Sequence, residues 1–416
     1  MKKFNAHEFA IGWRILILAI VGVATSSSSL LLYSFSAMVI PLEQGMGWTR
    51  GDLQAAITAL SLGTIVAAQL AGWLNNRFGL RRVTALSLIA LSISLVLLSQ
   101  INANIWALYI GYFLIPLAGL GTLQITWSHL INLWFVENRG LALAIILSGS
   151  GLAAAGLPIL ITIVVSQWGW QAGFLALALL PLTLALPISL FWLTTASKES
   201  SQATSDKVTS AACHGGVSLK DAFRSWRFWV CNLSMTLVVA CVVGMVTNII
   251  PLLQDSGLSA AEAGKVFSAF GVSLILGRLV VGYLIDRLWA PGVAAIALIM
   301  PAFACLIFAM EHSSSTLYVM ATLLVGIGAG AEFDIAAFLI ARYFGMRDYG
   351  RLFGVHLGMI TAGAAAAPLL FGKLYDSYQN YTAVLGFSAV CFTVGPLLLL
   401  SLGGYPKFRN ISPLPV

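Results

Sequence analysis

Long apolar runs separated by short polar segments make up most of the chain. Each run offers about the 20 predominantly apolar residues that an α-helix needs to cross the hydrocarbon core of a bilayer. The pattern therefore predicts an all-α membrane protein with twelve transmembrane helices. The predicted spans are residues 14–41, 52–74, 83–99, 105–134, 140–165, 172–193, 227–253, 262–285, 292–310, 317–341, 352–371 and 382–403.

The basic residues are distributed unevenly between the segments on the two sides of the predicted membrane. If both termini are cytoplasmic, 18 of the 22 basic residues lie in cytoplasmic segments, and only Arg50, Lys265 and Lys373 lie outside. This positive-inside bias predicts a multi-pass protein of the cytoplasmic membrane with both termini in the cytoplasm. The one basic residue left of the 22, Arg278, falls within a predicted span.

Composition narrows the class of protein. The chain of 416 residues is 59% hydrophobic and 9% charged, with a mean hydropathy of +0.93. A soluble fold of this size needs about 25% charged residues, so soluble enzymes, nucleic-acid binders and secreted disulfide proteins are excluded. The net charge of +7 is explained by topology and requires no anionic partner.

A polar stretch near the middle of the chain predicts two domains. Residues 196–226 read as a cytoplasmic linker, between a six-helix bundle at 1–195 and a second bundle with a short cytoplasmic tail at 227–416. The end of the linker, Ser218 to Trp226, begins like a capping box and mixes apolar with basic residues. This predicts a short helix at the membrane surface.

The two predicted bundles are related by an internal repeat. A shift of 210 residues, without a gap, aligns residues 40–42 with 250–252, both Ile-Pro-Leu, and Arg77 with Arg287. The same shift aligns the Ser/Thr caps with an acid three residues later, at residues 49–52 and 259–262. A repeat without inversion predicts two bundles related by an axis along the membrane normal, with the substrate path between them.

No cofactor or metal is expected. The cysteines lack metal-ligand spacing, and the glycine-rich runs at residues 149–151 and 326–330 lie within spans and lack the sequence of a phosphate-binding loop. Close helix packing explains these glycines. A transporter without a nucleotide site takes its energy from a gradient.

Arg278 is the main candidate for substrate binding. An arginine at the centre of a span costs about 2.5–3.5 kcal/mol on insertion scales, so it is expected to have a specific role. Its counterpart in the repeat is Ala68, so the charge does not belong to the shared scaffold. The alternative is a structural arginine paired with an acid on a neighbouring helix.

Several motifs resemble those of the major facilitator superfamily. Residues 72–82, Gly-Trp-Leu-Asn-Asn-Arg-Phe-Gly-Leu-Arg-Arg, resemble its signature between helices 2 and 3, with Asn76 in place of the aspartate that the second half retains as Asp286. Residues 33–35, 47–50, 134–140, 169–170 and 342–345 resemble the monocarboxylate and oxalate:formate branch. The resemblance implies transport of small organic anions by proton symport or exchange, with Arg278 as the anion-binding residue.

Two carboxylates follow in the tenth span. Glu332 and Asp334 are two residues apart, so they face roughly opposite sides of a helix. Glu332 is the candidate to pair with Arg278 or to carry a proton. Asp334 is expected near basic residues at the cytoplasmic end, as part of a gate. The gating or structural charges are Asp334, Arg77, Asp286, Arg287 and Arg342, with Arg351 nearby.

Neutral groups complete the predicted site. Tyr33, Gln124 and Asn248 are hydrogen-bonding candidates for the substrate, together with His356. The branch's dicarboxylate exchangers place a lysine in helix 11, and none occurs between residues 352 and 371, which favours a monoanion. Leu274 stands where animal-type carriers have an aspartate, so Glu332 becomes the substitute for proton coupling.

These observations predict a secondary transporter of a small organic anion, a monocarboxylate or an aromatic acid, working by alternating access with proton-coupled uptake. Exchange or efflux of carboxylates is an alternative within transport. A membrane sensor that binds a carboxylate without moving it is an alternative of another class. We expect the protein not to be an enzyme. We expect it to be a monomer in the lipid bilayer and to bind no nucleic acid.

Overall fold

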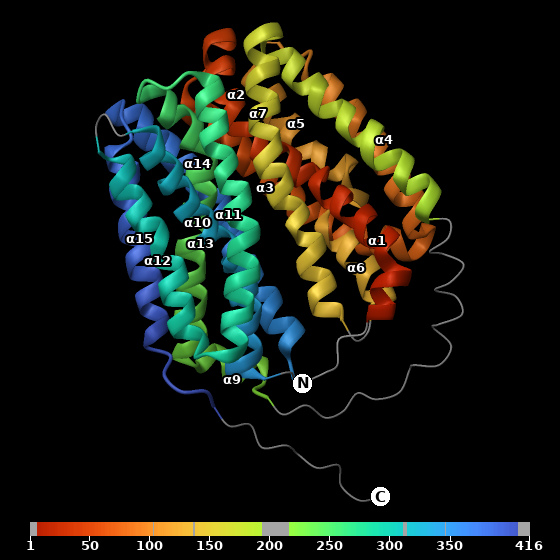
Figure 1. Cartoon of the computed structure of the whole chain (residues 1–416), viewed down its shortest axis with the longest axis vertical. Coiled ribbons are helices and arrows are strands. Elements are labelled where there is room, and N and C mark those ends of the chain that lie inside the picture. The colour runs from red at the N-terminus through yellow and green to blue at the C-terminus, as the bar shows by residue number, and fades with distance from the viewer. Residues whose placement is uncertain are drawn as a thin grey trace, which may run out of the picture. The chain divides into compact units, whose positions relative to one another are not determined.

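The computed structural model describes residues 6–102, 104–135, 138–193, 216–310, 314–345 and 347–406. These residues are almost entirely helical, as Figure 1 shows. Residues 196–215 of the predicted linker and 407–416 of the predicted tail lie outside this description.

The chain divides into two compact units by its Cα packing. Unit 1 comprises Met1–Asp206, Val246–Val272 and Pro368–Gln379, and unit 2 comprises Lys207–Met245, Ser273–Ala367 and Asn380–Val416. The units differ from the predicted halves because two stretches of the second half, at 246–272 and 368–379, pack with the first.

The first half of the sequence supplies most of the helices of unit 1. In chain order they are α1 (Ala6–Ala24), α2 (Ser27–Met46), α3 (Arg50–Phe78), α4 (Leu80–Leu98), α5 (Ile105–Ala118), the 3₁₀ turn η1 (Leu120–Thr122), α6 (Gln124–Trp134), α7 (Arg139–Leu180) and the π-helical turn η2 (Pro181–Ala185).

The second half of the sequence forms seven described helices. They are α9 (Leu219–Arg224), α10 (Trp226–Asp255), α11 (Ala260–Arg287), α12 (Ala290–Phe308), α13 (Ser315–Phe344), α14 (Tyr349–Tyr378) and α15 (Thr382–Leu400). Within unit 2, α12 packs against both α13 and α15.

Nine helices of the described chain are long and apolar enough to cross a membrane, and the α1–α2 pair, bent by 44°, makes a tenth. The non-helical backbone of Gly169, with φ of 81°, divides α7 into the two helices predicted at 140–165 and 172–193. With α5–η1–α6 taken as one interrupted span, the total is the predicted twelve.

Two predicted spans are broken, and the prediction of continuous helices over 14–41 and 105–134 is wrong. The first break lies between α1 and α2, where the side chain of Ser26 caps α2 by accepting from the Ser29 amide at 3.2 Å. The second lies between α5 and α6, where Leu123 is extended with ψ of 151°. Serine side chains compete for backbone hydrogen bonds, and this allows a break within an apolar run.

The predicted helix starts are confirmed. Thr49 and Asp52 form a complete capping box at α3. The equivalent pair in the repeat, Ser259 and Glu262, exchange hydrogen bonds of 3.0 and 3.3 Å through backbone and side chain. Ser218 caps the short helix α9 by accepting from the Asp221 amide.

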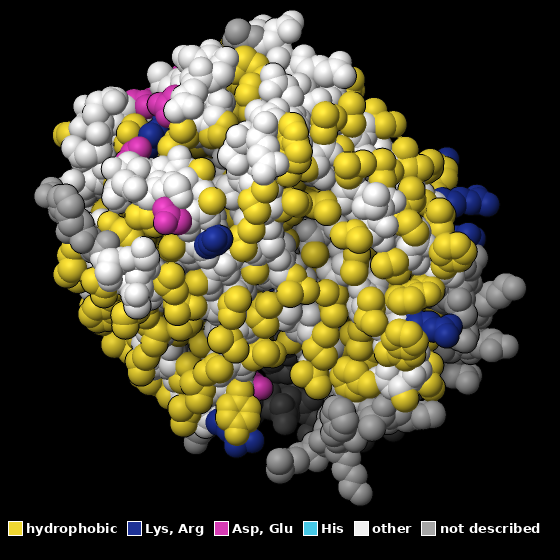
Figure 2. Space-filling view, turned by 45° about the horizontal axis from the view of Figure 1, so that its top comes forward, with side chains coloured by type: hydrophobic (Ala, Val, Ile, Leu, Met, Phe, Trp, Pro, Cys, Tyr) yellow, Lys and Arg dark blue, Asp and Glu magenta, His cyan; other side chains and the backbone are white. Residues whose placement is uncertain are grey.

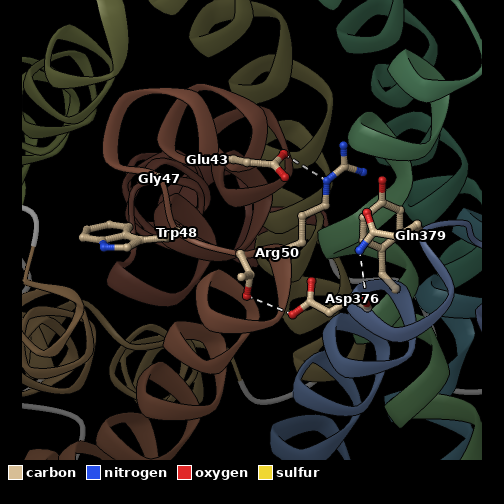
Figure 3. Close-up of a pocket in the computed structure, with 8 residues that line it drawn as sticks. Glu43, Gly47, Trp48, Arg50, Asp376 and Gln379 are labelled. Carbon is tan, nitrogen blue, oxygen red and sulfur yellow. Dashed lines mark hydrogen bonds and ion pairs between the residues drawn. The ribbon is translucent and has the colours of Figure 1, made fainter.

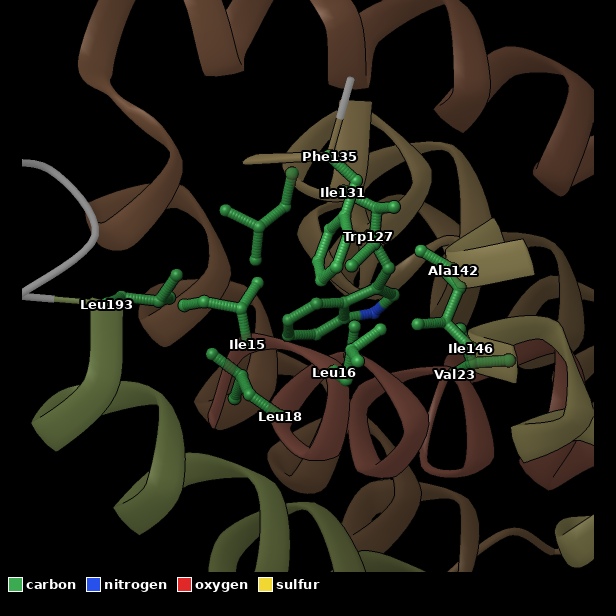
Figure 4. Close-up of a cluster of buried hydrophobic side chains, with 12 residues drawn as sticks. Ile15, Leu16, Leu18, Val23, Trp127, Ile131, Phe135, Ala142, Ile146 and Leu193 are labelled. Carbon is green, nitrogen blue, oxygen red and sulfur yellow. The ribbon is translucent and has the colours of Figure 1, made fainter. Parts of the chain in front are cut away.

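One buried apolar cluster of unit 1 joins α1, α6 and α7 (Figure 4). Trp127 lies in it with no exposed surface, and its indole Nε1–H donates to the Thr122 carbonyl at 3.0 Å. Gly22 of α1 packs against the indole, where a Cβ would overlap the ring. A small residue thus lets a large one fill the space between helices.

Apolar side chains also cover much of the exterior. On α4, Leu86, Ile93 and Leu97 are each more than half exposed. Figure 2 shows hydrophobic side chains over most of the visible face and few charged ones. Such a surface suits contact with lipid and would be unfavourable in water.

Candidate substrate site

Arg278 of α11 is buried in unit 2 and incompletely paired. Its residue is 7% exposed, and its Nε lies 3.5 Å from the Oδ2 of Asp334 on α13. Nη1 is buried and has no hydrogen-bond partner among the described residues. A guanidinium can donate five hydrogen bonds, so this one retains donor capacity for an anion.

Close packing of α11 on α13 sets this geometry. Gly277 lies where a Cβ would come within 2.6 Å of the Ile327 carbonyl oxygen, and a Cβ on Gly330 would overlap the carbonyl oxygen of Leu274. The glycines predicted to pack helices therefore bring the backbones together. Arg278 lies one residue beyond Gly277, and the two carboxylates follow Gly330 within four residues.

The structure assigns the two carboxylates differently from our expectation. Glu332 is 4% exposed, and its Oε2 has no hydrogen-bond partner among the described residues. The ion pair with Arg278 is made by Asp334, whose side chain is 34% exposed. The ion pair that we considered for Glu332 is thus made by Asp334, and carrying a proton is the role that stays open for Glu332. α13 turns the acid at 334 toward α11.

The other predicted gating charges lie at exposed positions. Three of the basic side chains stack on aromatic rings, with Arg77 5.2 Å from the Trp73 ring centroid, Arg287 4.2 Å from Tyr283 and Arg342 4.8 Å from Tyr405. Asp286 is exposed near the end of α11.

His356 of α14 has no exposed surface and is held by one neighbour. Its Nδ1 lies 2.9 Å from the Oδ1 of Asn232 on α10, while the Nδ2 of Asn232 donates to the Phe228 carbonyl at 2.7 Å. The amide oxygen is an acceptor, so the ring carries its proton on Nδ1. Nε2 is then an acceptor, and it has no partner among the described residues.

The neutral candidates fall in unit 1. Asn248 is 2% exposed, and its Oδ1 accepts from the Gln54 Nε2 at 3.0 Å. Tyr33 is half-buried, with its ring centroid 6.2 Å from that of Phe270. Gln124 is exposed at the start of α6. Asn248 thus has a structural partner that the sequence did not indicate.

Sequence reasoning missed a polar cluster around Arg50 in unit 1. Arg50 is 6% exposed; its Nη1 and Nη2 donate to the two carboxylate oxygens of Asp255 at 2.6 and 2.9 Å, and its Nε donates to Glu43 at 3.1 Å. The guanidinium lies 4.2 Å from the Tyr375 ring centroid. The sequence signal was a basic residue in the outer segments, where only three occur.

A cavity of about 410 Å³ lies beside this cluster. Figure 3 shows Arg50 directed at Glu43, with Asp376 close by on α14. The lining residues are Glu43, Gly47, Trp48, Thr49, Arg50, Tyr375, Asp376 and Gln379.

A helical membrane fold with ionisable groups inside its spans is typical of a membrane carrier. The family model of the Major Facilitator Superfamily matches residues 16–334 and 249–413, and the chain belongs to this family of transporters. It is a transporter and not an enzyme.

Curated relatives are similar over most of their length. An uncharacterized MFS-type transporter, YcxA of Bacillus subtilis, is 23% identical over 86% of each chain. A gallate transporter of Pseudomonas putida is 24% identical over 89% of this chain and 90% of its own. Monocarboxylate transporter 13 of Rattus norvegicus is 24% identical over 76% and 72%.

A solved structure supports the fold. The crystal structure of a D-xylose-proton symporter matches with a TM-score of 0.71 at 14% identity, covering 96% of this chain and 99% of its own. At this identity the match concerns the fold alone.

Proposed function

We propose that this transporter moves a small organic monoanion, a monocarboxylate or an aromatic acid, across the cytoplasmic membrane by alternating access. Arg278 binds the carboxylate, and uptake is coupled to a proton. In this proposal the protein acts as a monomer with both termini in the cytoplasm, as the distribution of basic residues favours.

The observation that carries the proposal is the incomplete pairing of Arg278. A buried cation is stable when charged or polar partners satisfy its donors. Here Nη1 has no partner in the described chain, and the contact of Nε with Asp334 is long, at 3.5 Å. A substrate carboxylate would supply the missing acceptors. The relatives named for gallate and for monocarboxylates support the same chemical class.

Glu332 is the proposed proton carrier. It lies on the helix that pairs with Arg278, it is buried, and its Oε2 has no described hydrogen-bond donor. A proton on this carboxylate removes a buried charge that no described hydrogen bond stabilises. Proton and anion would then enter together, and their charges would balance during the conformational change.

The decisive test is uptake by liposomes containing the full chain. A panel of labelled monocarboxylates, dicarboxylates and aromatic acids is offered with and without an inward proton gradient. Hydrogen bonds to a charged group contribute about 1.5–3 kcal/mol, so Arg278→Gln is expected to reduce uptake of the transported acid by about 10- to 100-fold. Lys265→Gln, which removes an exposed basic residue from the same helix outside the predicted gating charges, is the matched control. Saturable uptake at the normal rate in Arg278→Gln would refute the proposed role.

Exchange is distinguished in the same vesicles. If internal unlabelled substrate accelerates uptake and a proton gradient does not, the transporter is an exchanger and the proposed proton coupling fails. If the gradient drives accumulation and Glu332→Gln abolishes that accumulation, proton symport through Glu332 is supported.

A further inference from the structure

We propose that the residues around Arg50 form an outer lock, a set of bonds that closes the outer side of the transporter in one state and breaks when that side opens. The inference rests on the proposed alternating access. The outer side is the side opposite the predicted cytoplasmic ends. The outer lock consists of Glu43, Thr49, Arg50, Asp255, Tyr375 and Asp376.

Arg50 contacts the second half of the sequence through Asp255 and Tyr375. Arg50 begins α3, and Asp255, which receives two of its donors, ends α10. Tyr375 of α14 lies under the guanidinium, and its hydroxyl donates to the Oδ2 of Asp255 at 3.1 Å. The buried cation thus connects the outer ends of α10 and α14 to the start of α3.

A second residue of α14, Asp376, forms hydrogen bonds with the same end of α3. Its Oδ2 accepts from the Thr49 hydroxyl at 2.8 Å and from the Gly51 amide at 3.1 Å. Both donors are at the N-terminus of α3, where the helix dipole favours a carboxylate. A Cβ on Gly372 would lie 2.6 Å from the Gly51 Cα, so glycines allow this close approach.

A buried polar layer lies next to the lock. Pro251 has no N–H, and this leaves the Thr247 carbonyl without its usual helical donor. The Nε2 of Gln54 on α3 lies 3.3 Å from that carbonyl oxygen and donates to it. The Ile250 amide donates to the Ser36 hydroxyl of α2 at 3.0 Å. The segment of α10 around Pro251 thus offers backbone groups that side chains of the first half satisfy.

The lock does not belong to the scaffold shared by the repeats. With the shift of 210 residues, the counterpart of Arg50 is Ala260, and that of Asp255 is Gly45. The cap of α3 at Thr49 and Asp52 is repeated, but the ion pair is not. The charges therefore have a role beyond folding each bundle.

Its chemistry suits reversible closure. The side chains of Glu43 and Asp255 are 35% and 36% exposed, and Glu43 also lines the cavity of about 410 Å³. Water can hydrate these charges after separation, so the lock can open without leaving them desolvated. Removing one member while the structure is closed leaves the buried partner uncompensated, which favours the open state.

The test measures access to a buried position from outside. Ser36→Cys places a thiol at a site that is 1% exposed beside the lock. The full-length protein in right-side-out vesicles is treated with a membrane-impermeant maleimide, and the rate is compared with that of the chain lacking this cysteine. We expect Arg50→Gln and Asp255→Asn each to raise the labelling rate about 10-fold, and the double variant to exceed neither by more than 2-fold, since both remove one interaction.

Glu262→Gln is the matched control, because Glu262 is an outer carboxylate whose hydrogen bonds within the described chain are to Ser259 of its own helix cap. Its labelling rate should stay at the starting value. Tyr375→Phe keeps all charges and the aromatic ring, so it should raise the labelling rate less than Arg50→Gln does. It replaces Arg50→Gln in the test if that variant does not fold. Unchanged labelling in folded Asp255→Asn and Tyr375→Phe, or an equal increase in Glu262→Gln, would overturn the outer lock. Labelling needs no substrate, so a failure to transport carboxylates would refute the proposed function without changing this readout.

Discussion

Asp334→Asn is expected to strengthen anion binding, because Asp334 and the substrate compete for one guanidinium. Two unit charges 3.5 Å apart interact by about 5 kcal/mol at an effective dielectric constant of about 20. Solvent at the partly exposed Asp334 reduces this value strongly. We expect a net gain of about 1–2 kcal/mol in anion binding, equivalent to about a 5- to 30-fold lower Kd.

The assay is titration of the purified protein with the acid identified in the uptake panel, by calorimetry or intrinsic tryptophan fluorescence. Glu262→Gln is the matched comparison, since it alters an exposed carboxylate of α11 that bonds to Ser259 at its own helix start and has no place in the proposed anion site. The ligand-free Asp334→Asn protein should unfold at a lower temperature because Arg278 loses its ion pair, and bound anion should restore the difference.

An unchanged or higher Kd in folded Asp334→Asn would refute this competition. Asp334 would then orient Arg278 for the substrate or have no influence on it. Arg278→Gln should raise the Kd for the anion by about 10- to 100-fold in the same titration, a change opposite in direction to that expected for Asp334→Asn.

Two further predictions concern packing around the site. Gly330→Ala should destabilise the protein by about 1–3 kcal/mol, because the new Cβ overlaps the Leu274 carbonyl; thermal unfolding measures this, and Gly282→Ala, which has open space, should unfold normally. Asn232→Leu should cost about 1–3 kcal/mol by leaving the buried Nδ1–H of His356 without its acceptor; an unfolding temperature equal to that of the original chain would show that this bond is dispensable.

The sequence predicted the class of fold because the bilayer imposes a simple rule on composition. Backbone groups in lipid must be satisfied within the helix, so long apolar runs can form only spanning helices. The caps at Thr49 and Ser259 were also readable, since a cap is a local hydrogen-bond pattern. Breaks at Ser26 and Leu123 were not, because apolar content continues through both positions.

The candidate site was predictable in its parts but not in its pairings. Arg278, Glu332 and Asp334 stood out because ionisable residues within a span are rare. Which acid meets Arg278 depends on how α13 is rotated against α11, and the contacts of Gly330 with Leu274 set that rotation. The register of this crossing is not encoded in either helix alone, so the sequence analysis considered Glu332 as the partner of Arg278.

By itself, the sequence determined a helical membrane transporter built from two repeats, with a cation in one half that the other half lacks. These properties depend on composition, periodicity and internal alignment, which are all local or additive along the chain. The pairing of Arg278 with Asp334, and that of Arg50 with Asp255 205 residues away, follows from the three-dimensional packing of the helices. Such pairs form between side chains that distant helices bring together, and their choice depends on helix rotation and close backbone approach that no single segment encodes.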